Sequence, residues 1–326
     1  MRLVRGHHQT LDALEGHWAV TLGSFDGVHR GHAAILRECK TQAEAHGLQG
    51  SCALSFVHHP RSVLAGQRAP RILTSLEERV ALLNWLELDQ LVLLEFDDEL
   101  SRMDYTRFVR EILLDRLGMK HFVLGHDVHF GRHRGGNVHT ASALAEQEGF
   151  TLSQVASVRS AGEPVSSTRI RDVVARAEMG EATELLGHPF VVIGRVVEGR
   201  RLGRTLGFPT ANLEAQPPGK LLPPRGVYGA WVQLDEPAPA PWRPAVVNVG
   251  VAPTVRDGTR LQVEAHVLDG SYELYGQRIA VAFSSWLREE RKMSGLEELR
   301  EAIAQDIERV RETAAVLGAD LQLLTI

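Results

Sequence analysis

The sequence predicts two domains: an α/β domain built on a parallel sheet, followed by a mostly β domain, an antiparallel barrel with a C-terminal helix. A chain of 326 residues exceeds what one hydrophobic core usually fills, which favours two domains. Its first half alternates strand-like and helix-like segments, whereas its second half contains strand-like runs separated by turn residues. The helical patterns stop before Pro189, where the first strand of the new type begins, so we expect domains of residues 1–186 and 187–326.

In the first half, strand and helix patterns follow one another along the chain. Strand-like runs are expected at residues 19–25, 53–57, 91–96 and 121–124. After the first run, apolar residues recur at helical spacing from Ile35 to Ala43, and Gly47 supplies a stop. Ser75 and Glu78 form a capping-box pattern that opens a helix reaching Leu86. Further helices are expected at residues 105–117 and from Ser167 onwards.

The second half has the spacing typical of an antiparallel barrel or sandwich. Its strand-like runs are residues 190–197, 227–234, 245–249, 262–268 and 278–283. A last helix follows, with Ser294 and Glu297 expected to cap its start. The residues that share its apolar face are Leu296, Leu299, Ile303, Ile307 and Val310.

The composition excludes several classes of protein. A hydrophobic fraction of 44% and a charged fraction of 24% are typical of a folded globular chain, not of a fibrous or disordered one. The apolar runs fall far short of the roughly 18 residues of a membrane helix, and the N-terminus lacks the apolar stretch of a signal peptide. We therefore expect a cytoplasmic protein with no membrane partner. Only Cys39 and Cys52 occur, so no disulfide framework is available and both are expected to be small core residues.

The charge pattern bears on the ligands. A net charge of −5 lacks the basic footprint of a nucleic-acid-binding protein, so we expect no nucleic-acid partner. Anionic ligands must then be bound by local clusters of arginine. The two clusters are Arg169, Arg171 and Arg176, and Arg195, Arg200, Arg201 and Arg204. No feature of the sequence specifies an oligomeric state.

The segment from Gly23 to His32 lies where the first strand turns into the first helix. Ligands of open α/β sheets bind at the carboxyl ends of strands, and a helix N-terminus there offers free N–H groups to phosphate. Gly27 permits close approach of the backbone, while His29 and His32 can donate hydrogen bonds to phosphoryl oxygens. The segment predicts a phosphate site, with a glycine-rich turn carrying two exposed histidines as the alternative.

A second segment, residues 165–171 (VSSTRIR), places hydroxyls followed by arginine at an expected helix start. This is another phosphate cradle, for which plain helix capping is the alternative. Together the two segments resemble the HxGH and SSTxxR motifs of the nucleotidyltransferase superfamily, which implies a Rossmann-like domain that transfers a nucleotidyl group and releases pyrophosphate. The resemblance implies ATP contacts from Gly23, Ser24, Phe25, Asp26, Gly31, Ser167 and Thr168, and catalytic roles for His29, His32 and Arg169.

Two further segments, residues 56–60 and 123–131, resemble the flavin-side segments of bacterial FAD synthetases. The resemblance implies FMN contacts from His59, Pro60, Asp127 and Phe130. Family members usually carry Asn, Pro and a Phe-Arg pair where this chain has Ser24, His58 and Val128-His129.

The fifteen histidines raise the question of a metal site. Four candidate ligands lie close in sequence, namely His126, Asp127, His129 and His133. Zinc needs about four ligands in tetrahedral geometry, and no spacing here fixes that geometry. A solvated or substrate-contacting loop is therefore favoured over zinc.

The run from Gly199 to Asn212 holds three glycines four residues apart. It is not a P-loop, because that motif needs one more spacer, a Lys and a following helix, which Pro209 discourages. Its N–H groups can still wrap phosphates, and Thr210 and Asn212 offer hard oxygen ligands suited to Mg²⁺. A basic surface hairpin is the alternative.

The stretch GRTLGFPTAN in this run resembles the riboflavin kinase signature. Later blocks continue the resemblance in order: residues 226–229, 248–250 with 253–254, 263–269, 274–276 and 287–290. The resemblance implies that Thr210 and Asn212 contact Mg²⁺ and ATP, and that Glu264 is the general base for the ribityl hydroxyl. It also implies ATP or flavin contacts from Gly199, Gly203, Arg204, Gly207, Phe208, Pro209, Asn248 and Arg288.

Over nearly its whole length the chain thus resembles the prokaryotic bifunctional riboflavin kinase/FAD synthetases. The resemblance implies that riboflavin and ATP give FMN in residues 187–326, and that FMN and ATP give FAD and pyrophosphate in residues 1–186, with Mg²⁺ in both. Two alternatives remain. The first domain could adenylylate another acceptor, such as phosphopantetheine or a pyridine mononucleotide, although the attached kinase makes FMN a ready acceptor. The chain could instead be a flavin-binding regulator, although a mere binder needs no base such as Glu264.

Overall fold

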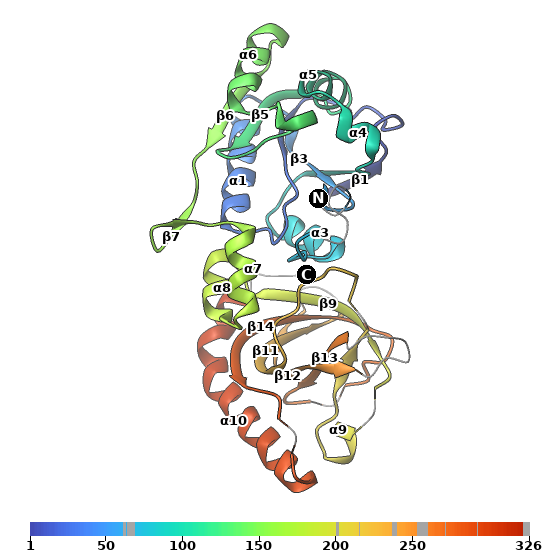
Figure 1. The fold of residues 1–326 in the computed structure, drawn as a ribbon, viewed down its shortest axis with the longest axis vertical. Coiled ribbons are helices and arrows are strands. Elements are labelled where there is room, and N and C mark those ends of the chain that lie inside the picture. Colours follow the sequence, from blue (N-terminus) through green and yellow to red (C-terminus); the bar gives the residue numbers. More distant parts are fainter. Residues whose placement is uncertain are drawn as a thin grey trace. The chain divides into compact units, whose positions relative to one another are not determined.

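The computed structural model describes residues 1–60, 63, 69–199, 202–214, 216–236, 240–252, 260–270, 272–291 and 293–321 (Figure 1). Its contacts divide the chain into two compact units. The first unit is Met1–Ile72 with Leu82–Ser166, and the second is Leu73–Ala81 with Ser167–Ile326. The predicted fold class is confirmed, because the first unit holds a parallel sheet with helices and the second a closed antiparallel barrel with a C-terminal helix. The division of activities at residue 186 stays a prediction.

The sheet of the first unit has the strand order β1-β4-β3-β2-β5-β6, and every neighbouring pair is parallel. Its strands are β1 (Arg2–Gly6), β2 (Trp18–Leu22), β3 (Gly50–Phe56), β4 (Gln90–Leu94), β5 (Met119–Gly125) and β6 (Thr151–Val155). The chain passes from β2 outward through β3 to β4, and later returns to the other side of β2 with β5. The order therefore reverses at β2, which makes its carboxyl end the place where open α/β sheets bind ligands.

Helices connect the strands of this sheet. Those predicted around residues 35–43, at 75–86 and at 105–117 are present, whereas those at residues 98–102, 132–134 and 138–148 were not predicted. The helices are α1 (Arg30–Ala45), α3 (Leu76–Trp85), α4 (Asp98–Arg102), α5 (Tyr105–Arg107) continued by the π-helix η2 (Phe108–Leu114), the 3₁₀ turn η3 (Arg132–Arg134), and α6 (Val138–Glu148). The Ser75–Glu78 capping box is confirmed, since each backbone N–H donates to the other side chain, at 2.7 and 3.2 Å. The helix predicted at residues 105–117 is present, but it changes to π-helical pitch at Phe108.

The core of the first unit lies on both faces of the sheet. On one face β2 and β5 pack against η2 through Val20, Phe122 and Ile112. On the other face Ala19 and Val123 pack against Cys39 and Ala43 of α1. Both cysteines are fully buried, as predicted, and burial raises the pKa of Cys39 to about 12, so its thiol stays protonated and unreactive.

The second unit is a six-stranded barrel in the order β10-β13-β12-β11-β14-β9. Its strands are β9 (Phe190–Val197), β10 (Ala211–Leu213), β11 (Gly226–Leu234), β12 (Trp242–Ala252), β13 (Arg260–Val267) and β14 (Arg278–Arg288). Its helices are α7 (Ser167–Ala175), α8 (Met179–Leu186), α9 (Leu202–Thr205) and α10 (Leu296–Leu321). Helix α10 lies along the barrel (Figure 1). Its Ile307 and Val310 pack against Val227 and Val246 of the barrel.

Two details of α10 differ from the prediction. Leu296 is 58% exposed and does not share the buried face. The N–H and the hydroxyl of Ser294 both donate to the carboxylate of Glu298, at 2.7 Å, and not to that of Glu297 as predicted. The reason is the helix start. Because α10 begins at Leu296, one residue later than a cap at Ser294 requires, its third position falls on Glu298.

A buried ion pair fastens the segment Leu73–Ala81 within the second unit. Nζ of Lys220 lies 2.6 Å from Oε2 of Glu78, and both side chains are fully buried. The ammonium also donates to the carbonyl oxygens of Leu73 and Val191, at 2.6 and 3.3 Å. The other carboxylate oxygen, Oε1 of Glu78, accepts the N–H of Ile193 at 3.0 Å. Every donor of the ammonium thus has an acceptor.

No helix in the described part of the chain is long and apolar enough to cross a membrane.

Candidate active sites

The loop after β2 carries an unusual backbone. Phe25, Gly27 and Val28 have φ of 48°, 86° and 42°, so three residues in four are left-handed. Left-handed non-glycine residues cost about 1–3 kcal/mol each and concentrate at ligand-binding sites. The side chains of Phe25 and Val28 are buried, which holds this turn in place at the carboxyl end of β2.

The two histidines predicted to contact phosphate come together at the start of α1. His29 is the N-cap, and its Nδ1 accepts the N–H of His32 at 3.4 Å. The two rings stack with centroids 3.7 Å apart. A Cβ on Gly31 would lie 3.1 Å from the His29 ring, so glycine leaves room for this ring. Because His29 is only 7% exposed, the alternative of two exposed histidines is disfavoured.

The segments expected to contact FMN follow the strands on either side of β2. His59 and Pro60 come after β3, and Asp127 comes after β5. Since β3 and β5 both run parallel to β2, their carboxyl ends lie at the same edge of the sheet as His29. Phe130 differs, because its ring is buried in the core against Phe122, with centroids 5.8 Å apart. Its contact with FMN stays a prediction.

Helix α7 begins at Ser167, as predicted, so Ser167, Thr168 and Arg169 form its first turn. The guanidinium of Arg169 donates to Oε1 of Glu181 on α8 at 2.8 Å, and the Arg169 side chain is 19% exposed. Glu181 therefore orients the arginine to which the sequence assigns a phosphate contact.

In the second unit, the glycine-rich run before β10 folds so closely that two of its glycines are required. A Cβ on Gly199 would lie 2.4 Å from Nδ2 of Asn212, and a Cβ on Gly203 would lie 2.3 Å from the carbonyl oxygen of Phe208. The N–H of Phe208 donates to the carbonyl of Gly203 at 2.8 Å and closes the turn. Gly207 has a φ of 86°, a conformation that favours glycine.

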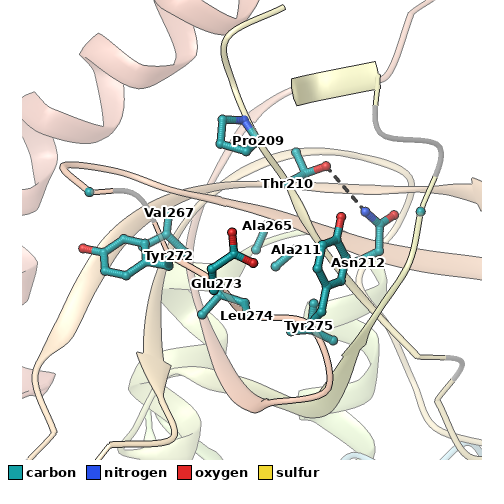
Figure 2. A pocket seen from close by; sticks show the side chains of 13 residues that line it. Pro209, Thr210, Ala211, Asn212, Ala265, Val267, Tyr272, Glu273, Leu274 and Tyr275 are labelled. Carbon is teal, nitrogen blue, oxygen red and sulfur yellow. Dashed lines mark hydrogen bonds between the residues drawn. The ribbon is translucent and has the colours of Figure 1, made fainter. Parts of the chain in front are cut away.

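Thr210 and Asn212 lie together at the end of this run (Figure 2). Nδ2 of Asn212 lies 3.5 Å from the hydroxyl of Thr210. Oδ1 of Asn212 accepts from Nε2 of Gln262 at 3.1 Å, and Asn212 is only 5% exposed. The structure therefore brings a hydroxyl and an amide side chain together, with the amide nitrogen facing the hydroxyl and the amide oxygen facing Gln262.

Glu264 stands beside this pair in the barrel wall. The strand register places Asn212 of β10 opposite Glu264 of β13, and Glu264 opposite Asn248 of β12. Residues directly opposite in antiparallel strands point to the same face, so the three side chains form a row across three strands. The sequence predicts all three as site residues but does not show that they are neighbours. Oδ1 of Asn248 is buried without a hydrogen-bond partner among the described residues.

A pocket opens next to this row (Figure 2). Thr210 and Asn212 line it on one side, and Tyr272, Glu273 and Tyr275 line it on the other. Ala265 and Val267 of β13 line it from the barrel wall. Because successive side chains of a strand point to opposite faces, Glu264 points to the other face of β13. Asn212 is thus the residue common to the pocket and the row.

Sequence reasoning missed the pocket side formed by Tyr272 and Glu273. Its only signal was the Leu274-Tyr275-Gly276 block.

Two arginines are predicted to contact ATP or flavin in the kinase site, Arg204 and Arg288. Arg288 forms a two-pronged ion pair with the buried Asp306 of α10, with contacts of 2.8–3.2 Å, and thereby joins β14 to α10. Arg204 belongs to α9. Arg200, Arg201, Pro253 and Thr254 lie outside the described residues.

In the first unit, Nδ1 of His129 contacts the backbone carbonyl of Asp127 at 2.9 Å.

Comparison with known proteins gives consistent matches. A family model for FAD synthetase matches residues 12–169, and one for riboflavin kinase matches residues 186–314. A protein of Pseudomonas fluorescens, named bifunctional riboflavin kinase/FMN adenylyltransferase, is 38% identical over 315 residues, which are 97% of this chain and 98% of that protein. The protein of the same name from Escherichia coli strain K12 is 35% identical over 312 residues, 96% and 97% of the two chains. A solved structure described as a macrolide-efflux protein from Streptococcus pneumoniae superposes with a TM-score of 0.84 at 25% identity, covering 95% of this chain and 98% of that one.

Proposed function

The chain belongs to the family of bifunctional riboflavin kinase/FMN adenylyltransferases, which make FMN and then FAD, and we propose that it does so at the two sites described above. Phosphorylation of riboflavin is assigned to the barrel, and adenylylation of FMN to the carboxyl edge of the parallel sheet. The observation that carries the kinase assignment is the row of Asn212, Glu264 and Asn248 beside Thr210. Membership of this family sets aside both another acceptor and a non-catalytic regulator.

Both activities use ATP with a divalent metal, and we assign Mg²⁺ to the kinase site. Thr210 and Asn212 fit it by chemistry, because a hydroxyl and an amide carbonyl are hard oxygen ligands, and their side chains lie side by side. To offer Oδ1 to the ion, the Asn212 amide would give up the bond that it accepts from Gln262. Bound there, Mg²⁺ supplies neutralisation of the triphosphate charge. Gly199 and Gly203 keep the surrounding backbone close, so that its N–H groups can bind phosphate oxygens.

Glu264 acts as the general base of the kinase reaction. Its carboxylate takes the proton of the primary ribityl hydroxyl while that oxygen bonds to the γ-phosphorus of ATP. The bond from this phosphorus to the β-phosphate oxygen breaks, and ADP leaves. Phosphoryl transfer needs little more than positioning and charge stabilisation, which the neighbouring Asn212 and Asn248 can share.

Adenylylation needs no protein nucleophile. A phosphate oxygen of FMN bonds to the α-phosphorus of ATP, and the bond to the pyrophosphate oxygen breaks, so no proton has to move. His29, His32 and the N-terminal end of α1 stabilise the charge that develops on pyrophosphate. Ser167, Thr168 and Arg169 keep their predicted phosphate role as a proposal.

The test is to incubate each protein with riboflavin or FMN, ATP and Mg²⁺ and to separate the flavins. Glu264→Gln should lower riboflavin phosphorylation about 10²- to 10⁴-fold and spare adenylylation of added FMN. His32→Ala should do the reverse, with FAD formation lowered about 10²- to 10³-fold while FMN accumulates. Matched controls are Glu214→Gln, an exposed carboxylate just after β10, and His46→Ala, at the far end of α1. Near-normal kinase turnover in Glu264→Gln contradicts the assigned base.

A further inference from the structure

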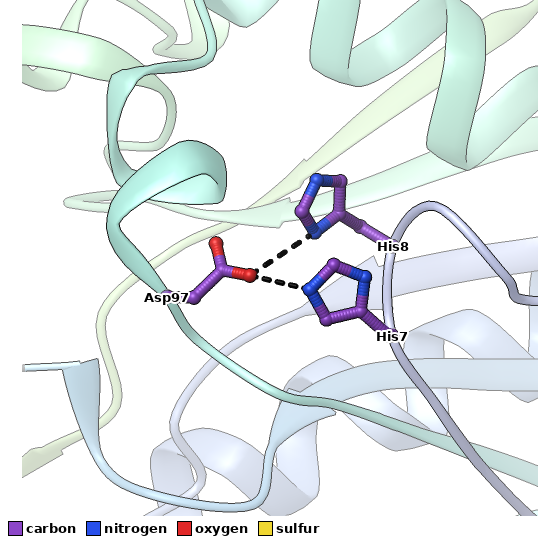
Figure 3. A group of neighbouring side chains, drawn as sticks. All are labelled: His7, His8 and Asp97. Carbon is purple, nitrogen blue, oxygen red and sulfur yellow. Dashed lines mark hydrogen bonds and ion pairs between the residues drawn. The ribbon is translucent and has the colours of Figure 1, made fainter.

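A second cluster of polar side chains lies at the carboxyl edge of the sheet, away from the loop after β2. His7 and His8 follow directly after β1, and Asp97 follows β4 and caps α4 (Figure 3). Because β1 and β4 are paired and parallel, their carboxyl ends meet, which brings residues some 90 positions apart into contact. Two strands, β4 and β3, stand between β1 and β2, so the cluster lies roughly 10–15 Å from the nucleotide loop.

His8 is the unusual member of this cluster. It is only 4% exposed, and neither of its ring nitrogens has a hydrogen-bond partner among the described residues. The nearest carboxylate oxygens lie 3.7 Å from Nδ1, on Asp97, and 3.5 Å from Nε2, on Glu99. Leaving buried polar atoms unpaired is unfavourable, so this imidazole indicates a ligand that the protein itself does not supply.

The charges around His8 select a cation. Oδ1 of Asp97 accepts the N–H of Leu100 at 2.7 Å, which leaves Oδ2 facing both imidazole rings. Burial disfavours the Asp97 carboxylate, but the Leu100 N–H and His7 outweigh it and hold the pKa of Asp97 below its usual range. A carboxylate repels phosphate and other anions. Two imidazoles with one carboxylate suit Zn²⁺ and similar transition metals, whereas Mg²⁺ and Ca²⁺ prefer oxygen ligands alone.

We propose that His7, His8 and Asp97 form a binding site for a divalent transition-metal ion of the Zn²⁺ kind, distinct from the Mg²⁺ used with ATP. Each of the three residues offers one ligand atom within 4.8 Å of the other two, and we take Nε2 of His7 and Nδ1 of His8, the ring nitrogens that face Oδ2 of Asp97, as the histidine ligands. Three protein ligands leave a fourth tetrahedral position for water.

The distances fit such an ion with a small adjustment. Ligands that each stand about 2.0–2.1 Å from zinc lie roughly 3.3 Å apart. The separation of Asp97 from His8 is 3.7 Å, slightly wider, and that of Asp97 from His7 is 2.5 Å, a hydrogen bond. The ion takes the place of the proton on Nε2 of His7, and that proton moves to Nδ1. The backbone N–H of Gln9 now donates to Nδ1 at 3.3 Å, and this long bond is given up when Nδ1 becomes protonated.

Glu99 completes the arrangement from outside. Its Oε1 lies 3.5 Å from Nε2 of His8, on the side of the ring away from Asp97, and its Oε2 is held by the amide of Gln9 at 2.6 Å. Metal-binding histidines commonly donate their second N–H to a carboxylate, which fixes the ring and its tautomer. Here Glu99 would hold the proton on Nε2 and free Nδ1 for the metal.

The test uses the full chain without an affinity tag. Titration with Zn²⁺ alone, followed by calorimetry, should show one ion per chain, and Co²⁺ in its place should give the strong visible absorption of a tetrahedral site. His8→Ala and Asp97→Asn should abolish both signals, and Glu99→Gln should weaken binding about 10- to 100-fold. His139→Ala, an exposed histidine on α6, is the matched control and should bind like the wild type.

The wild-type titration decides the matter without any variant, because it does not depend on how a mutant folds. Absence of a stoichiometric Zn²⁺ site in the wild type overturns the proposal. So does Zn²⁺ binding that survives in Asp97→Asn, a variant that keeps the α4 cap because Asn caps helices as well as Asp. Loss of binding in His139→Ala would likewise place the metal elsewhere. Retained cooperative unfolding of each variant without metal shows that a lost signal reflects lost ligands.

Discussion

Breaking the buried ion pair between Glu78 and Lys220 is expected to destabilise the barrel unit strongly. The substitution Glu78→Gln keeps the size of the side chain but leaves the ammonium of Lys220, which is fully buried, without its counter-charge. Removing one partner of a buried pair costs about 3–5 kcal/mol, because the remaining charge is uncompensated. The amide also brings N–H donors towards the N–H of Ser75 and the ammonium, which both now donate to Oε2 of Glu78.

This cost converts into a measurable shift of the melting temperature. For a unit of this size, 1 kcal/mol shifts Tm by about 2–4 °C, so we expect a fall of roughly 6–20 °C. The matched control is Glu87→Gln, which breaks the Lys40–Glu87 pair at 2.9 Å, whose side chains are 41% and 78% exposed. An exposed pair of this kind contributes little to stability because water screens it, so the control should melt nearly like the wild type.

Scanning calorimetry can resolve the barrel transition, which is identified by its upward shift with riboflavin or with ADP and Mg²⁺. The double variant Glu78→Gln with Lys220→Met removes the unpaired charge and should recover most of the lost stability. If the double variant instead melts at the sum of the two single losses, the destabilisation comes from packing and the charge argument is refuted.

Two other predictions concern pH and fragments. His121 is buried between the hydroxyls of Thr151 and Ser153, at 2.7 and 3.0 Å, and burial, assisted by His46, lowers its pKa. As the pH falls, the unfolded chain therefore binds the proton before the folded chain does, so the stabilising contribution of neutral His121 is complete above about pH 6.5 and is lost below it. His121→Gln should flatten the dependence of the unfolding free energy on pH, measured by denaturation curves at several pH values. An unchanged dependence contradicts the assignment. A fragment of residues 187–326 should phosphorylate riboflavin without making FAD but melt below the full chain, since it lacks Glu78 and also the helices α7 and α8 of the same unit. Lys220→Met should raise the Tm of this fragment, and a fragment as stable as the barrel in the full chain contradicts the role of Glu78.

The sequence predicts well where local pattern and motif coincide. β9 has the predicted bounds, α7 starts at the predicted Ser167, and the loop after β2 holds the stacked His29 and His32. Strands with weak patterns were missed. β1 is mostly exposed, and β10 is only three residues long, so neither shows an alternating apolar run. Missing β1 had a consequence for the metal site. Only the pairing of β1 with β4 brings His7 and His8 to Asp97.

Glu78 shows why local pattern cannot define the folding unit. The spacing of three residues between Ser75 and Glu78 predicts its place in the capping box. The same carboxylate, however, binds Lys220, which is 142 residues away, and no periodicity relates the two positions. A boundary at residue 186 follows the change in order of strands and helices, whereas contacts place both Leu73–Ala81 and Ser167–Leu186 with the barrel. For Leu73–Ala81 the two criteria differ because a segment of nine residues contributes little to the pattern, yet a single buried charge in it contributes several kcal/mol of stability.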